Sequence, residues 1–138
     1  MAPEQPVSKS VAAPAEAASS APPEEHVSRA GMLELFGQDE NLLRELAGLF
    51  LEDGTALLHE LRTAIAGLDA AKVDRAAHTL KGSVGNFGAM RAFELCGRLE
   101  AMGRSHDLGG APEVLAALEQ EMSRVVGLLT EITRENSE

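Results

Sequence analysis

The chain contains no tryptophan or tyrosine, and its only aromatic residues are four phenylalanines. This absence removes the stacking platforms on which single-stranded nucleic acids bind. Basic residues are also scarce, because 12 Lys and Arg face 22 Asp and Glu, for a formal net charge of −10. Binding to a phosphate backbone requires clustered Lys and Arg. We therefore do not expect a nucleic-acid partner.

Cysteine is nearly absent too: Cys96 is the only one, so no intrachain disulfide can form, and a reducing compartment fits. No segment resembles a signal peptide, and no apolar run is long enough to span a bilayer. The four histidines and Cys96 show no metal-ligand spacing. We expect a cytoplasmic protein that does not insert into a membrane and has no metal or cofactor of its own.

The residues that are plentiful favour helices. Apolar residues make up 44% of the 138 positions, and most of them are Leu, Ala and Val. Residues 1–26 are rich in Ala, Pro, Ser and Glu without a periodic apolar face, which predicts a disordered tail or linker. We expect one domain over residues 27–135 and a short C-terminal tail over 136–138.

After this first segment, apolar residues recur at helical spacing and predict one short and four long helices. Asp39 and Asp69 are the expected N-caps of the first two long helices, and Gly37 and Gly88 are expected to end helices. The stretch "GRSHDLGGAP" is the clearest loop. No segment alternates strictly between apolar and polar residues, as a half-buried strand would. The fold class predicted is all-α, an antiparallel four-helix bundle with a short additional N-terminal helix.

The third of these helices contains a histidine in an unusual setting, "AHTLKGSVGNFG". At about 100° per residue, His78 lies about 140° from Val73, so it should face solvent. The buried face of this helix comprises Val73, Ala77, Leu80, Val84 and Phe87.

Three residues near His78 suggest what it does. Lys81 lies one turn along, beside the imidazole, while Gly82 and Gly85 flank it one and two turns later and leave an open approach. Imidazole is a nucleophile near neutral pH, and a lysine offsets the charge of a phosphoryl group. We therefore predict that His78 accepts a phosphoryl group, with Lys81 stabilising the phosphate and both glycines providing steric access.

The segment "AHTLKGSVGNFGAMRAFELCGRLEAMGR" resembles the core of histidine-containing phosphotransfer (HPt) domains, with A-H-x-L-K-G followed by C-x-x-L-E. The resemblance is dense over residues 73–104 and weaker over 27–135. It implies that His78 is phosphorylated, that Lys81 steadies the phosphoryl group and that Gly82 keeps the imidazole accessible. One departure is Gly85, where family members often have Ser or Ala. It leaves the implied role of His78 intact.

The resemblance also implies a phosphorelay role, in which a ring nitrogen of His78, Nε2, takes the phosphoryl group from a receiver-domain aspartate and passes it to another. The partners would be response-regulator receivers, including that of a hybrid histidine kinase, and Mg²⁺ would come with the receiver. The chain has no Gly-rich nucleotide loop, so we expect a monomeric phosphocarrier and not an enzyme. Met32, Leu35 and Phe36 are candidate docking residues.

Two other functions remain open. A dimerisation and phosphoacceptor segment of a sensor kinase is also helical, but there Asp or Glu usually follows the histidine, where this chain has Thr79. A helical adaptor would bind partners without chemistry, and His78 would then be an ordinary surface histidine. We interpret Cys96 as a buried hydrophobe and "ELCGRLE" as packing and surface charge. The remaining histidines are taken as incidental: His26, His59 and His106.

Overall fold

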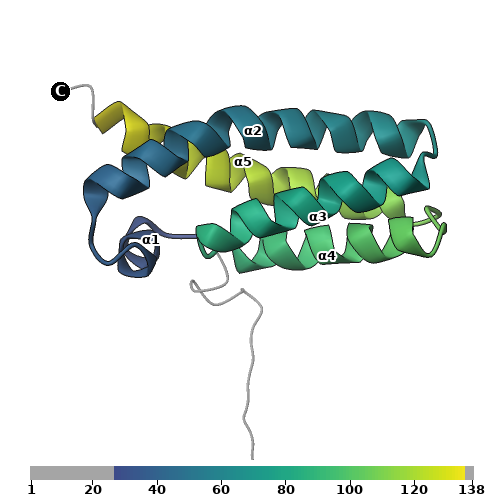
Figure 1. Ribbon diagram of the computed structural model, residues 1–138, viewed down its shortest axis with the longest axis horizontal. Coiled ribbons are helices and arrows are strands. Elements are labelled where there is room, and N and C mark those ends of the chain that lie inside the picture. Colours follow the sequence, from purple (N-terminus) through teal and green to yellow (C-terminus); the bar gives the residue numbers. More distant parts are fainter. Residues whose placement is uncertain (1–26, 136–138) are drawn as a thin grey trace, which may run out of the picture.

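The computed structural model describes residues 27–135, and the regular elements in this range are all helices. Four long helices run antiparallel in a bundle, and a short helix lies at one end of it (Figure 1). The predicted fold class is thereby confirmed. The predictions for residues 1–26 and 136–138 lie outside the described residues. The helices are α1 Arg29–Leu35, α2 Glu40–Ala66, α3 Ala70–Asn86, α4 Met90–Arg104 and α5 Ala111–Glu135.

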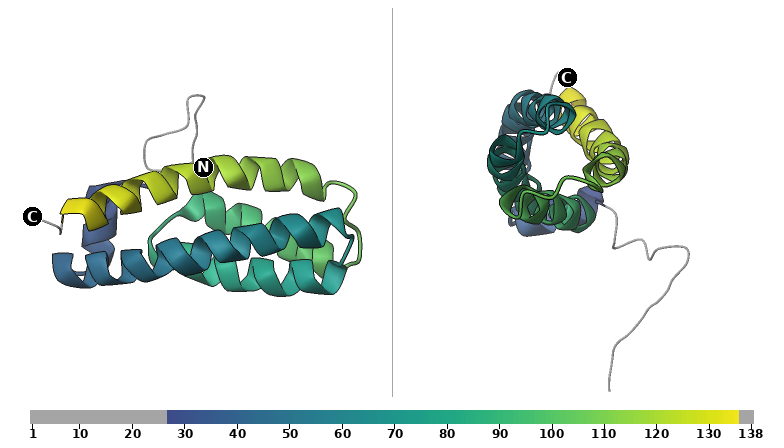
Figure 2. Two further views of the ribbon diagram at one scale, coloured as in Figure 1. Left: turned by 90° about the horizontal axis from the view of Figure 1, so that it is seen from above. Right: turned by 90° about the vertical axis from the view of Figure 1, so that its right-hand side faces the viewer.

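The four long helices form a closed ring in the order α2, α3, α4, α5. Helix α2 packs against α3 and α5, and α4 packs against the same two helices (Figure 2). Each buried leucine or methionine in the centre contributes about 1.5–3 kcal/mol. The bundle therefore holds the exposed side chains of α3 and α4 on a well-packed support. The largest fully buried side chains include Leu43, Leu61, Leu80, Leu99, Leu118, Met122, Leu129 and Ile132.

Helices α2 and α3 begin where the sequence predicts. The Asp39 carboxylate accepts a hydrogen bond from the backbone N–H of Leu42, and that of Asp69 accepts one from Lys72. Each bond satisfies a donor that has no partner within the helix. Both predicted N-caps are thus confirmed, and they fix the phase at which α2 and α3 start.

A tight turn joins α3 to α4 and supports α1. Gly88 has a φ of 73°, which side-chain-bearing residues rarely adopt, and a Cβ there would lie 2.7 Å from the Leu35 side chain of α1. Next to it, the rings of Phe36 and Phe87 stack with their centroids 5.6 Å apart. Helix α1 is therefore held against the C-terminal end of α3.

Cys96 lies in the core on α4, as predicted. Burial raises the pKa of its thiol to about 12, and this outweighs the opposing effect of the nearby Lys81 charge. No helix within residues 27–135 combines the length and apolar character needed to cross a bilayer.

Candidate functional site

His78 projects from the outer face of α3. The five residues predicted to form the inner face of this helix are all buried, whereas the His78 side chain is 68% exposed. The predicted orientation of the imidazole is confirmed. The ring is anchored on a helix of the packed bundle, yet it remains open to a macromolecular partner.

A buried carboxylate on α4 backs this exposed ring. Glu100 Oε2 lies 2.7 Å from His78 Nδ1 and 2.7 Å from Arg104 Nη2, while Glu100 Oε1 lies 2.7 Å from Lys81 Nζ. The side chain of Glu100 is only 6% exposed. One carboxylate thus joins His78, Lys81 and Arg104, and we call these four residues the Glu100 cluster. The interpretation of "ELCGRLE" as packing and surface charge was wrong at Glu100, because this residue is buried against the histidine.

The hydrogen bonds to Glu100 determine its charge. The bond from Lys81 is the largest influence, and with the bond from His78 it lowers the pKa of Glu100 from 4.5 to about 2 although burial acts in the opposite direction. The carboxylate is therefore ionised at neutral pH and has no proton to donate. The proton between the two groups belongs to Nδ1 of His78, so in the neutral ring Nε2 keeps its lone pair. The free nitrogen is the one that faces away from Glu100.

Lys81 is held against α4 in this arrangement. Its Nζ lies 5.6 Å from the centroid of the Phe93 ring, and its Cδ lies 3.8 Å from the position that a Cβ on Gly97 would occupy. Together with the ion pair to Glu100, these contacts fix the lysine beside the carboxylate. In this conformation the lysine stabilises the ionised form of Glu100.

The two glycines that follow His78 have different surroundings. No atom lies within 4 Å of a Cβ built on Gly82, so this side of His78 is open. A Cβ on Gly85 would instead lie 3.1 Å from the Phe93 ring. The space beside Gly85 is thus filled by α4, and the steric access that we predicted for Gly85 is not found there. This glycine allows close packing of Phe93, the same ring that contacts Lys81.

Among the residues described, no group of three or more His, Cys, Asp or Glu side chains is placed to hold a metal ion. His59 is exposed on α2, and His106 lies in the loop after α4 with a φ of 57°. His26 lies outside the described range. The site is therefore the Glu100 cluster with the open surface at Gly82.

Glu100 and Arg104 are the site residues that the sequence prediction missed. A signal for Glu100 was present, because it continues the buried stripe of α4 formed by Ala92, Cys96 and Gly103. A carboxylate on such a stripe must find partners, since burying an unpaired charge is costly. Arg104 could then be predicted as a partner of Glu100, because it lies one helical turn later on the same side of α4.

Comparison with known proteins adds two matches. The family model described as Hpt domain matches residues 45–127, a range that contains His78, Lys81 and Glu100. The crystal structure of histidine-containing phosphotransfer protein B (HptB) from Pseudomonas aeruginosa PAO1 is similar, with a TM-score of 0.72 and 26% sequence identity. The similarity covers 80% of this chain and 96% of that one. No curated protein sequence matches the chain.

Proposed function

The chain belongs to the Hpt domain family and serves as a histidine phosphotransfer domain in two-component phosphorelays, and from this premise we propose that His78 carries the phosphoryl group. The observation that carries the assignment is the pairing of an exposed imidazole with a buried, ionised carboxylate at 2.7 Å. This pairing leaves Nε2 unprotonated on a ring that is largely exposed to solvent. Neither His59 nor His106 has a carboxylate at such a distance among the described contacts.

The transfer begins at the phosphorylated aspartate of a receiver domain. The lone pair of Nε2 attacks phosphorus in line, an N–P bond forms, and the P–O bond to aspartate breaks with its electron pair left on the carboxylate. In the reverse sense, the aspartate of a second receiver attacks the phosphohistidine. This protein contributes the nucleophile, so it acts as a phosphocarrier and consumes no nucleotide.

Glu100 lowers the barrier in both directions. As the N–P bond forms, the ring that already holds a proton on Nδ1 becomes positively charged. A fixed carboxylate beside Nδ1 stabilises this charge without having to reorganise. Lys81 keeps the carboxylate ionised, and as a cation one helical turn from His78 it can also offset the charge of the incoming phosphoryl group. Gly82 leaves room for the receiver.

We propose that the partners are receiver domains, including that of a hybrid histidine kinase, and that the chain meets them as a monomer in the cytoplasm. The receiver would bring Mg²⁺ in its own acidic pocket. A monomer fits the fold, because one chain supplies all four long helices of the bundle. The rival sensor-kinase segment would need two chains.

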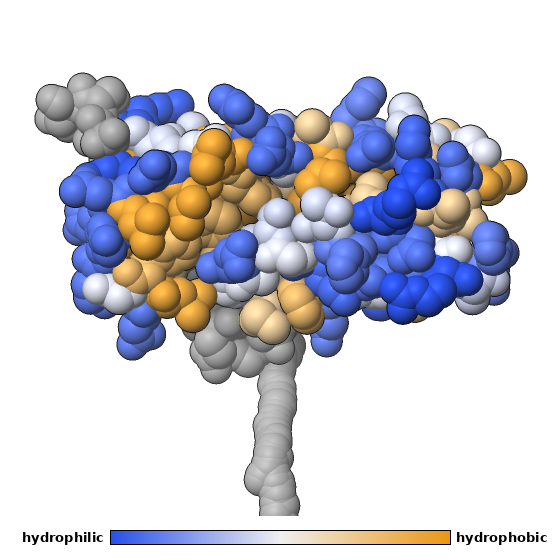
Figure 3. All heavy atoms as spheres, in the orientation of Figure 1, coloured by the Kyte–Doolittle hydropathy of each residue, from blue (hydrophilic) through white to orange (hydrophobic). Residues whose placement is uncertain are grey.

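The docking face is proposed to extend from His78 toward α1. Apolar side chains gather there over α1 and the start of α2, where Leu35, Leu42 and Leu49 are exposed (Figure 3). Of the three candidates from the sequence, Leu35 is 60% exposed and Phe36 is partly buried, but Met32 is buried and unavailable.

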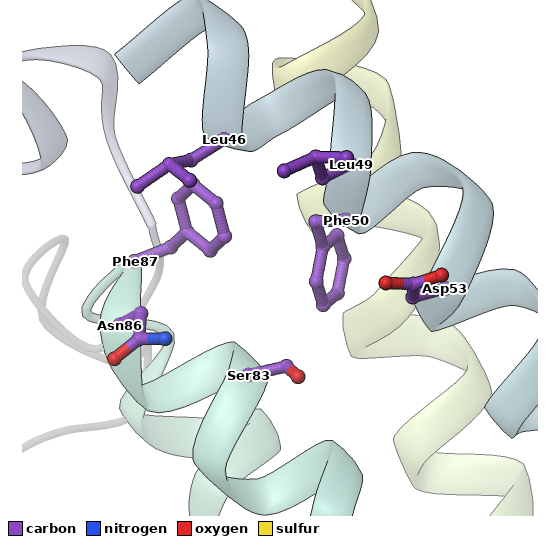
Figure 4. Close-up of a pocket in the computed structure, with 7 residues that line it drawn as sticks. All are labelled: Leu46, Leu49, Phe50, Asp53, Ser83, Asn86 and Phe87. Atoms are coloured by element: carbon purple, nitrogen blue, oxygen red, sulfur yellow. The ribbon is translucent and has the colours of Figure 1, made fainter. Parts of the chain in front are cut away.

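Leu49 also lines a groove between α2 and α3. Phe50 and Phe87 contribute their rings to it, and Ser83 and Asn86 line it on the α3 side (Figure 4). Because α3 also carries His78, a receiver that places an apolar side chain in this groove would reach the imidazole with the same surface.

The test measures the transfer of a ³²P-labelled phosphoryl group from a receiver domain in the presence of Mg²⁺. The acceptors are wild type, His78→Gln and His59→Gln. We expect acid-labile, base-stable label on wild type and on His59→Gln, and none on His78→Gln. Label on His78→Gln would show that another residue accepts the group. No label on any of the three, with several receivers, would favour a helical adaptor, and an obligate dimer in solution would favour the sensor-kinase segment.

A further inference from the structure

Helices α3 and α4 face each other in a regular antiparallel register. The Lys81 side chain of α3 lies against Gly97 of α4, and the Phe93 ring of α4 packs on Gly85 of α3. His78 and Glu100 form the next pair toward the start of α3. These contacts are made by side chains, which depend on the spacing of the two helices and do not set it.

One turn further on, the helices touch through their backbones. A Cβ on Gly103 would lie 2.6 Å from the carbonyl oxygen of Ala70 and 2.6 Å from the backbone nitrogen of Asp74. No side chain at position 103 fits this space. The adjacent Arg104 also links the two helices at this crossing, because its Nη2 lies 3.4 Å from Asp74 of α3 and 2.7 Å from Glu100 of α4.

We propose that Gly103 is a positioning residue for phosphotransfer: by letting the backbone of α4 touch that of α3, it sets the distance across which Glu100 holds Nδ1 of His78. The inference rests on the proposed role of His78. Gly103, which has no side chain, would thus keep the Glu100 carboxylate within hydrogen-bond distance of the His78 ring.

The size of the effect follows from the contact distances. Ordinary contact begins at 3.4 Å, so a methyl group at 2.6 Å requires about 0.8 Å more separation between the helices. The bond of 2.7 Å between His78 and Glu100 would then stretch to about 3.5 Å, beyond the N–H···O range of 2.7–3.2 Å. Alanine also suits a helix better than glycine, so helix propensity alone would favour the substitution. Any loss of the hydrogen bond between His78 and Glu100 must therefore come from the wider spacing of α3 and α4 and not from a weaker helix.

The experiment measures the tautomer of His78 directly. Gly103→Ala is introduced into a background stabilised by Gly48→Ala and Gly127→Ala, since nothing lies within 4 Å of a Cβ at either position and alanine favours the helix. The ¹⁵N chemical shifts of the imidazole, read where the ring is neutral, give the ratio of Nδ1–H to Nε2–H forms. We expect this ratio to fall about tenfold or more, because a hydrogen bond to a charged group is lost.

Two controls isolate the effect. Gly97→Ala places its methyl group 3.8 Å from Lys81, an ordinary contact, and should leave the ratio unchanged. Leu118→Ala removes a buried side chain of α5 and destabilises the fold, yet it should also leave the ratio unchanged.

A wild-type ratio in folded Gly103→Ala would overturn the inference. So would failure of this variant to fold in the stabilised background, since Gly103 would then serve the fold and not the site. The measurement uses no phosphodonor. If wild type were never labelled on His78, the proposed function would fail while the tautomer result stood.

Discussion

Glu100 and His78 lie 22 positions apart in the sequence, and the Glu100 carboxylate accepts a hydrogen bond from Nδ1–H of His78 across 2.7 Å. The two partners differ sharply in exposure, since one side chain is in solvent and the other is buried. A buried anion therefore orients the exposed imidazole that we propose as the nucleophile. The first two predictions test this relationship.

Replacement of Glu100 by Gln should slow phosphotransfer about tenfold, because a charge-assisted hydrogen bond becomes a neutral one and the charged ring loses its counter-charge. The measurement is the single-turnover rate from a phosphorylated receiver. Glu94→Gln, an exposed position on the same helix, is the matched control and should react like wild type. Equal rates for both variants would remove Glu100 from the mechanism.

The same residue should make stability depend on pH. Its pKa in the folded protein, about 2, is below the ordinary 4.5, so its contribution is complete above pH 4.5 and is lost as the pH falls toward 2. We expect this contribution to the unfolding free energy to be on the order of a few kcal/mol. Urea unfolding of wild type and Glu100→Gln should show a difference in unfolding free energy that shrinks across this window. A difference independent of pH would contradict the assignment.

Gly82→Ala should separate stability from function. The added methyl group meets no atom within 4 Å, so the free energy of unfolding should rise by about 1 kcal/mol through helix propensity. Transfer should nevertheless slow severalfold, because the methyl group narrows the approach to His78. Gly127→Ala on α5, also in open space, should gain similar stability with an unchanged transfer rate. If both variants transferred normally, Gly82 would have no role in access.

A charge on the docking face should impair recognition and leave the fold intact. Leu49 is 55% exposed beside the groove between α2 and α3, so Leu49→Glu should change the unfolding free energy by less than about 0.5 kcal/mol. The KM for the phosphorylated receiver should rise about tenfold or more. Leu68→Glu is the control, because Leu68 is 74% exposed in the turn at the opposite end of α2. Equal effects of both substitutions would place the receiver elsewhere.

Local rules were sufficient to predict the helices and the outward direction of His78. The Asp39 and Asp69 caps depend on hydrogen bonds to residues three positions away, and the helical wheel depends only on a constant turn angle. Contacts within one helix can be derived from spacing in the sequence. The phosphoacceptor candidate is such a local feature.

Contacts between helices were not predicted. The wheel of α3 has no information on which residue of α4 lies opposite, so it assigned the space beside Gly85 to a partner, when Phe93 fills it. For the same reason, the sequence pattern led us to interpret Glu100 as a surface charge. Its role depends on the spacing of two helices, which is set at Gly103 by a backbone contact that no periodicity reveals.

The site is contributed by one helical hairpin, and the turn at Gly88 joins its two arms with few residues to spare. One residue inserted in α4 between this turn and Glu100 would rotate Glu100 by about 100° relative to α3 and carry it away from His78, while the composition and helix content of the chain hardly changed. The number of residues between the turn and Glu100 is thus as much a requirement of the proposed chemistry as the histidine itself.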